Sequence, residues 1–132
     1  MSGETNLAVL LANATPEHNA GNYVFCKVIS LEGIDLLAVS MMFREKEAIT
    51  LILSQEYADF LRLEYSSVFA WITLTIHSSL DAVGLTAAFS SALAKVGISC
   101  NVVAAFHHDH IFVGAHDVGG AMKALRNLSS LG

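Results

Sequence analysis

Charge is scarce in this chain of 132 residues, and basic charge is the scarcer kind. Only 14% of the residues are charged, and 7 Lys or Arg residues stand against 12 Asp or Glu residues, which gives a formal net charge of −5. The basic residues form no cluster, whereas nucleic-acid binding depends largely on neutralising phosphates. We therefore expect no nucleic-acid partner.

Cysteine is also rare, and the cysteines show no paired spacing. Cys26 and Cys100 lie inside apolar segments, which favours reduced, buried thiols over a disulfide or a zinc site. A bilayer-crossing helix needs about 20 mostly apolar residues, and the longest uncharged run here alternates with Ser and Thr. Residues 7–12 are too short for a secretory core and lack a basic lead-in. We expect a cytoplasmic protein without membrane association.

Apolar residues, in contrast, make up 54% of the chain. This share exceeds that of an average soluble domain, so another chain is expected to cover part of the surface. We therefore expect a homodimer or a larger homo-oligomer. The length suits one compact domain or two very small units that share a core.

The clearest pattern runs from Trp71 to Val113. Ile72, Leu74 and Ile76 alternate with polar residues, as in a strand with one covered face. A loop over residues 78–84 follows, rich in groups that can bond the free amides of a helix start. The next apolar residues recur at the spacing of a helix stripe and comprise Leu85, Ala88, Phe89, Ala92, Leu93 and Val96.

The same stretch ends in a predicted hairpin. Gly97 follows the helix, where glycine most easily forms a left-handed C-terminal cap. Residues 98–106 and 111–113 have the composition of strands, and residues 107–109 form the turn between them. The predicted order is strand, helix, strand, strand, which is most of a ferredoxin-like βαββαβ unit.

The segment before residue 67 has a weaker version of this pattern. Strands at residues 36–43 and 48–53 are predicted around a charged turn at residues 44–47. Ser54 then caps a helix with a buried stripe of Tyr57, Phe60 and Leu61. Hairpin, cap and helix recur at the end of the chain, where Asp117 precedes the stripe Val118, Ala121, Met122 and Leu125. The two halves therefore resemble a diverged internal repeat.

The beginning of the chain is predicted to supply one more strand. Thr5 can cap a short helix with Leu7, Leu10 and Leu11 on one side, and a strand is the alternative. Residues 13–22 are predicted as a loop and Tyr23–Val28 as a strand. A complete βαββαβ unit ends in a strand, whereas this chain ends in a helix. We hypothesise that Tyr23–Val28 lies beside a strand of the second half and supplies the missing edge.

Three motifs of the second half match one known family. Asp81-Ala82-Val83-Gly84-Leu85 stands where that family has an Asp-x-x-Gly-Leu turn, Gly97-Ile98-Ser99 opens the next strand, and Asp109-His110-Ile111-Phe112-Val113 is similar to its third strand. The second half thus resembles the ACT domain, a small-ligand-binding regulatory module. Residues 70–75 and 97–103 are similar to a subfamily of short tandem-ACT proteins of undefined role, related to the aspartokinase type of tandem.

The resemblance implies both the fold and the division of the chain. The fold class is α+β: a ferredoxin-like ACT tandem in which helices cover one face of an antiparallel sheet and strands are shared between the halves. The expected halves are an ACT-like unit at residues 1–66 and an ACT domain at residues 67–132. The first half is the weaker match.

The loop before the predicted helix, Ser78–Leu85, is the expected binding site. A strand that runs into a helix start presents backbone amides and the positive end of the helix dipole, which suit a carboxylate. The resemblance implies that an amino acid usually binds here, often where two ACT units meet. The residues implicated are His77, Ser78, Ser79, Asp81, Val83, Gly84 and Leu85 and, across the interface, Ile98, Asn101, Val102 and Val103.

Each of these residues also has a purely structural interpretation. Gly84 can serve tight helix packing, and Ser79 and Asp81 can be helix caps. Asn101, whose amide can donate and accept as amino-acid recognition requires, can instead satisfy the edge of a strand. His77 can contact a ligand carboxylate when protonated, or lie on the solvated sheet face.

Two further hypotheses remain open. An assembly module with a degenerate ligand loop would bind another protein through a sheet face bearing Phe69 and Trp71. A metal-binding domain would use the turn histidines at residues 107–110, but neighbours in a tight turn point apart and only His116 could converge on them. No glycine-rich phosphate loop, nucleophile elbow or carboxylate pair is present, so we expect no enzyme activity and no metal or cofactor.

Overall fold

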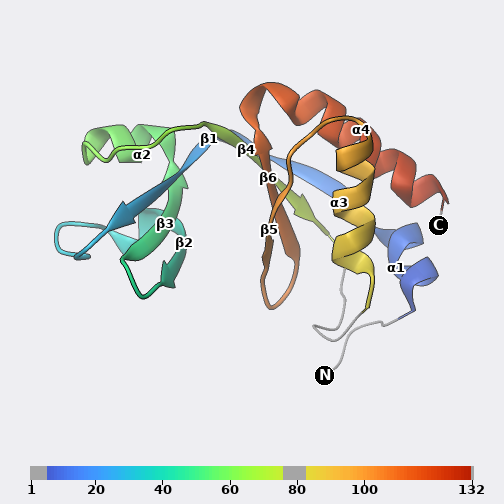
Figure 1. The fold of residues 1–132 in the computed structure, drawn as a ribbon, viewed down its shortest axis with the longest axis horizontal. Coiled ribbons are helices and arrows are strands. Elements are labelled where there is room, and N and C mark those ends of the chain that lie inside the picture. The colour runs from blue at the N-terminus through green and yellow to red at the C-terminus, as the bar shows by residue number, and fades with distance from the viewer. Residues whose placement is uncertain (1–5, 76–82, 132) are drawn as a thin grey trace. The chain divides into compact units, whose positions relative to one another are not determined.

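The protein has the predicted α+β fold. A computed structural model describes residues 6–75 and 83–131, with side chains up to residue 128. Six strands follow one another across the sheet in the order β2-β3-β1-β4-β6-β5. The elements shown in Figure 1 are α1 (Leu7–Asn13), β1 (Pro16–Val28), β2 (Val39–Arg44), β3 (Ile49–Ser54), α2 (Gln55–Phe60), β4 (Phe69–Leu74), α3 (Leu85–Lys95), β5 (Asn101–Ala104), β6 (Asp109–Gly114) and α4 (Val118–Leu131), with short 3-10 turns at Leu36–Ala38 and Ala115–Asp117.

The chain forms two compact units. The larger unit comprises Met1–Ala20 and Ala70–Gly132, and the smaller unit comprises Gly21–Phe69. Strand β1 contributes to both, with Pro16–Ala20 in the larger unit and the rest in the smaller one.

In the larger unit, α1, α3 and α4 gather on one face of the strands (Figure 1). The first part of β1 and then β4, β6 and β5 give the strand order of a ferredoxin-like unit. The alternation predicted for β4 is confirmed at Ile72 and Leu74, which are buried in the core beneath the helices, and Ile76 lies outside the described residues. The core also holds Phe89 and Leu93 of α3, and each such side chain stabilises the fold by roughly 1.5 to 3 kcal/mol when fully buried.

The helix ends of the larger unit follow local chemistry. Gly97 takes the predicted left-handed conformation after α3, with a φ angle of 75°. Helix α1 is capped by Asn6, whose side-chain oxygen accepts a hydrogen bond from the Val9 amide at 3.2 Å. The predicted cap Thr5 lies outside the described residues, and Asn6 satisfies the free amide in its place.

The smaller unit is a three-stranded antiparallel sheet with one short helix. Strand β3 pairs with β1 on one side, from Tyr23 opposite Ser54 to Val28 opposite Ile49, and with β2 on the other. The Ser54 cap is confirmed, because its hydroxyl accepts a hydrogen bond from the Tyr57 amide at 3.1 Å. The core of the smaller unit is a separate cluster that includes Val24, Cys26, Leu51, Leu53 and Ala58.

A strand is shared between the halves, as predicted, and it is β1. Tyr23–Val28 pairs with β3 of its own half. The part that joins the larger unit is Pro16–Ala20, which was wrongly predicted as loop. There the backbone amide of Thr75 donates to the Thr15 carbonyl at 2.8 Å, and the side-chain amide of Asn19 donates to the Trp71 carbonyl at 3.3 Å. These partners are distant in sequence. They hold the polar segment Pro16–Ala20 in a strand conformation, which the composition of the segment does not favour.

Three smaller predictions are also corrected. Residues 36–38 form a 3-10 turn before β2, because the Asp35 carboxylate accepts a hydrogen bond from the Leu37 amide at 3.0 Å and caps that turn. Phe60 is 79% exposed and not part of a buried stripe, since α2 has only 6 residues and packs inward through Ala58. Strand β5 covers only 4 residues, within the predicted range 98–106.

Candidate functional site

A glycine occupies the N-terminal capping position of α3. Gly84 occupies the capping position with a φ angle of 93°, and as a glycine it has no side chain with which to bond the first amides of the helix. Any other residue would be strained in this conformation. An added β-carbon would also lie 3.2 Å from Cδ2 of Leu7 on α1. The glycine therefore has a packing role, and the N-terminus of an 11-residue helix follows it.

The residues predicted for the loop and for the start of the next strand fall into three groups. His77, Ser78, Ser79 and Asp81 lie outside the described residues. Val83, directly before Gly84, is 85% exposed. Leu85 and Ile98, in contrast, are buried members of the apolar core of the larger unit, so their side chains contribute packing.

The remaining predicted residues lie on the edge strand β5. Asn101 is opposite Phe112, and its side-chain amide donates to the Phe112 carbonyl at 3.2 Å. Val102 and Val103, partly buried, lie opposite Ile111 and His110. Part of the donor capacity that makes Asn101 suitable for amino-acid recognition is thus used within the hairpin, which leaves its side-chain oxygen as an acceptor.

The smaller unit has a loop that corresponds to the one before α3. It follows β1, as the other follows β4, and Gly33 takes the left-handed conformation there, with a φ angle of 77°. The Ser30 hydroxyl accepts from the Glu32 amide at 3.1 Å. Three further amides of this loop donate as follows: Ile34 to the Leu31 carbonyl at 3.1 Å, Asp35 to the Tyr57 hydroxyl at 2.8 Å, and Leu37 to the Asp35 carboxylate at 3.0 Å.

A polar network joins β1, β4 and β6 of the larger unit. The indole N–H of Trp71 donates to Nδ1 of His110 at 3.0 Å, so this nitrogen carries no proton. Oγ1 of Thr73 lies 3.1 Å from the same nitrogen, and the side-chain amide of Asn19 donates to this Oγ1 at 2.9 Å. Burial, and then the nearby His108, lower the pKa of His110, which agrees with its neutral acceptor role. Trp71 is therefore tied into the sheet.

The turn histidines do not form a metal site. Among residues 6–75 and 83–131, no group of three or more His, Cys, Asp or Glu side chains could hold a metal ion. The rings of His108 and His110 are 6.5 Å apart between centroids, and those of His107 and His108 are 6.3 Å apart. Burial raises the pKa of the neighbouring Asp109 carboxyl.

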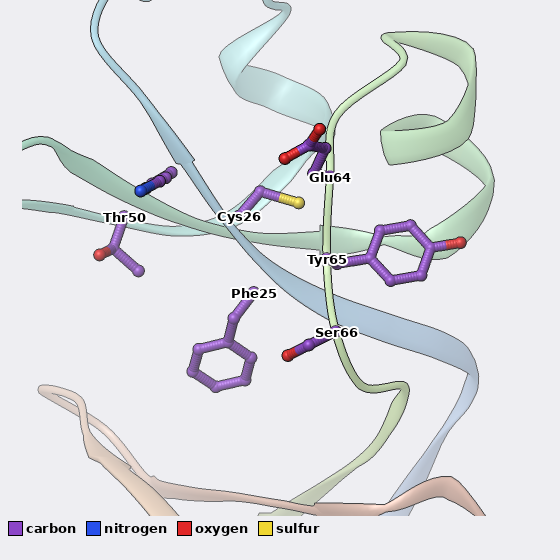
Figure 2. A pocket seen from close by; sticks show the side chains of 7 residues that line it. Phe25, Cys26, Thr50, Glu64, Tyr65 and Ser66 are labelled. Carbon is purple, nitrogen blue, oxygen red and sulfur yellow. The ribbon is translucent and has the colours of Figure 1, made fainter.

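The smaller unit contains a pocket that sequence reasoning missed. It has a volume of about 530 Å³ and lies between β1 and the segment at residues 64–66, as Figure 2 shows. Strand β1 contributes Phe25, Cys26 and Lys27, and Thr50 extends this wall from β3. Glu64, Tyr65 and Ser66 form the opposite wall. No sequence signal marks these residues, because three distant segments build the pocket.

Several side chains of the pocket are fixed by their partners. The Tyr65 hydroxyl donates to the Asp59 carboxylate at 2.7 Å and accepts from the Gln55 amide at 3.0 Å, so its ring points away from the pocket centre (Figure 2). The Phe25 ring packs edge-on against Phe69, with centroids 5.1 Å apart. Burial raises the pKa of the Cys26 thiol, and Asp59 adds to the shift, which keeps the thiol neutral.

Comparison with known proteins gives consistent matches. Two models described as ACT domain match residues 2–70 and 66–127. A Vibrio cholerae protein of unknown function, described as a possible transport protein, is 46% identical, with a TM-score of 0.83 over 93% of this chain and 95% of that one. An Agrobacterium tumefaciens protein is 20% identical, with a TM-score of 0.69 over 89% and 90% of the two chains.

The aspartate kinase regulatory subunit from Thermus thermophilus, in its ligand-free form, shares the fold. It is 10% identical, with a TM-score of 0.61 over 87% of this chain and 98% of that one. A search of curated proteins found no match. No helix in the described part of the chain is long and apolar enough to cross a membrane.

Proposed function

Because this chain belongs to the ACT-domain family, we propose that it is a non-catalytic regulatory protein that binds a small molecule, an amino acid. Its two ACT-like halves would be residues 1–66 and 67–132. The ligand would be held at the loop before α3, with residues 77–85 on one side and Ile98, Asn101, Val102 and Val103 on the other.

One observation carries this proposal beyond family membership. Helix α3 begins after Gly84, which has no side chain to cap it, and the first amides of a helix and the positive end of its dipole suit a ligand carboxylate. Asn101 keeps a side-chain oxygen that can accept a hydrogen bond from a ligand ammonium. An amino acid carries both groups.

Signalling would follow from linkage. A ligand shifts the balance between two arrangements only by its difference in affinity for them. A ligand held between ACT units would stabilise the docked arrangement, and a downstream partner would respond to that state. The proposed compartment is the cytoplasm, where free thiols such as Cys26 and Cys100 persist.

We also propose that the protein forms a homodimer or larger assembly. Large apolar side chains are exposed on the smaller unit, including Leu37 at 98%, Ile29 at 93% and Phe43 at 64%. Phe43 lies on β2, which is an edge strand of the sheet. Such exposure is typical of surfaces that another chain covers, and it equally supports a second candidate, an assembly module without a functional ligand loop.

A thermal-shift screen with the twenty amino acids tests the proposal. A ligand at about a hundred times its dissociation constant adds roughly 2.7 kcal/mol to the free energy of unfolding. Ala87 is exposed in the first turn of α3, so Ala87→Glu places a competing carboxylate beside the same amides. The uncharged control is Ala87→Gln.

We expect one or a few amino acids to raise the melting temperature of the wild type and of Ala87→Gln but not of Ala87→Glu. Without ligand, Ala87→Glu should be at least as stable as Ala87→Gln, because its charge favours the helix start. A shift that persists in Ala87→Glu would remove the site from α3. The absence of any shift would favour the assembly module.

A further inference from the structure

A groove of about 370 Å³ lies between α3 and α4 of the larger unit. Small apolar side chains line it, namely Ala88 and Ala92 of α3 and Ala124 of α4, together with Leu128. All four residues are half-buried. Alanine side chains are too short to fill the space between two helices at the surface, so the groove can receive a large apolar side chain from another molecule.

The helices of the larger unit carry positive charge only. Helices α1, α3 and α4 contain Lys95, Lys123 and Arg126 but no Asp or Glu. Lys95 lines the groove and is exposed, and it forms no ion pair within the described part of the chain. A partner with acidic groups beside its apolar side chain is therefore favoured over a basic one.

Helix α2 of the smaller unit has these properties. Phe60 at its end is exposed, and its ring stacks on the Tyr57 ring with centroids 6.1 Å apart. Glu56 precedes Phe60 by four residues, so the two side chains lie on the same face of the helix. Glu56 is exposed and forms no ion pair among the residues that the structure describes, and α2 contains no basic residue. Helix α2 thus presents a fixed aromatic ring beside a carboxylate.

We propose that the groove between α3 and α4 binds α2 of a second copy of this chain. The Phe60 ring enters between the alanines, and the Glu56 carboxylate pairs with the Lys95 ammonium group. Aromatic side chains that fill apolar pockets contribute much of the affinity of protein interfaces, and charge pairs at the rim add specificity. The contact joins unlike surfaces, so a pair of copies keeps one open groove and one open α2, and further copies add head to tail to form a ring or a chain.

Sedimentation velocity of the full-length protein over a range of concentrations tests this contact. Phe60→Ser should raise its dissociation constant by about tenfold or more, because the buried ring is lost. Lys95→Glu and Glu56→Lys should each raise it by about threefold or more, and a chain with both substitutions should associate as the wild type does, because the charges are exchanged. The matched controls Lys46→Glu and Glu47→Lys, exposed in the β2–β3 turn, should leave it unchanged.

A second set of variants separates this contact from an effect on folding. Ser91 is exposed and lines the groove, four residues before Lys95. The new carboxylate in Ser91→Glu pairs with Lys95 within α3 and competes with Glu56, whereas the uncharged control Ser91→Gln does not. Ser91→Glu should therefore associate weakly and Ser91→Gln normally. Because Phe60→Ser keeps the groove and Ser91→Glu keeps α2, an equimolar mixture of the two should contain a larger species than either alone.

The contact does not depend on a ligand, and no amino acid is added in these experiments. Assembly through Leu37, Ile29 and Phe43 persists in all of these variants, so its failure is distinguishable from failure of the groove. A single molecular mass at all concentrations in the wild type and the variants would overturn the proposal, as would association that Phe60→Ser and Ser91→Glu leave unchanged. Binding to vesicles of anionic lipid that Lys95→Glu abolishes, without self-association, would also overturn it and assign the groove to a membrane surface.

Discussion

The two loops that follow the first strand of each half differ in the element that comes after their left-handed glycine. In the smaller unit, the amides of Glu32, Asp35 and Leu37 donate to groups of the protein itself. In the larger unit, Gly84 is followed directly by the 11-residue α3. Both loops contain a left-handed glycine.

The elements that follow the two glycines differ in their capacity to hold an anion. In the smaller unit a 3-10 turn of 3 residues stands where the larger unit has the 11-residue α3. A short turn has no appreciable dipole, and local side chains consume its donors. We therefore place the proposed anion site at α3 and not at the corresponding loop of the first half.

Substitution of the two glycines should give the largest effect. Gly84→Ala and Gly33→Ala should each lower the free energy of unfolding by about 1 to 2 kcal/mol, because both positions are left-handed. Gly84→Ala should be the more damaging, since its new methyl group meets Leu7 whereas nothing lies within 4 Å at Gly33. Urea denaturation measures both. An equal decrease in the free energy of unfolding for the two variants would show that the Leu7 side chain moves aside without an energetic cost.

Removing the acceptors of backbone amides in the loop of the smaller unit, residues 30–37, should have a smaller effect on stability. Tyr57→Phe removes the acceptor of the Asp35 amide, and Ser30→Ala removes that of Glu32. Each change should lower the free energy of unfolding by about 1 kcal/mol, as is usual for one hydrogen bond. Gln55→Ala, which removes a partner of Tyr65 instead, is the control outside the loop. A neutral result for both loop variants would mean that water replaces these acceptors, and the contrast between the loops would weaken.

The smallest expected effect concerns the pH dependence of stability in the larger unit. The pKa of His110 is lowered from its usual 6.5, so the unfolded chain takes up this proton first as the pH falls below about 6.5, and stability decreases. The raised pKa of Asp109 acts in the opposite sense, at lower pH, between its folded value and 3.8.

In the variant His110→Asn, the new side chain can still accept a hydrogen bond from the Trp71 N–H, but it does not titrate. Melting temperatures of His110→Asn, measured from pH 7 to pH 5, should therefore decline less than those of the wild type. Identical pH profiles for the two proteins would show that protonation of His110 has no effect on folding.

The sequence predicted those features that depend on neighbours along the chain. The alternation of β4, the Ser54 cap and the left-handed Gly97 are all set by adjacent residues, and all are confirmed. The fold class followed from the resemblance of residues 72–113 to one family. The ligand assignment of Gly84 and Asn101 stays a prediction.

The features that sequence did not predict depend on distant partners. Pro16–Ala20 is a strand because β4 lies beside it, and its own composition is that of a loop. The pocket joins Lys27 and Glu64 from segments that share no motif. The network around His110 joins three strands, and local patterns specify no such contact.

The most direct test follows the backbone amides of both loops by NMR while the stabilising amino acid from the thermal screen is added. We predict shifts at residues 85–87, at the start of α3, and none at residues 32–37. Shifts at residues 32–37 without shifts at residues 85–87 would contradict the account.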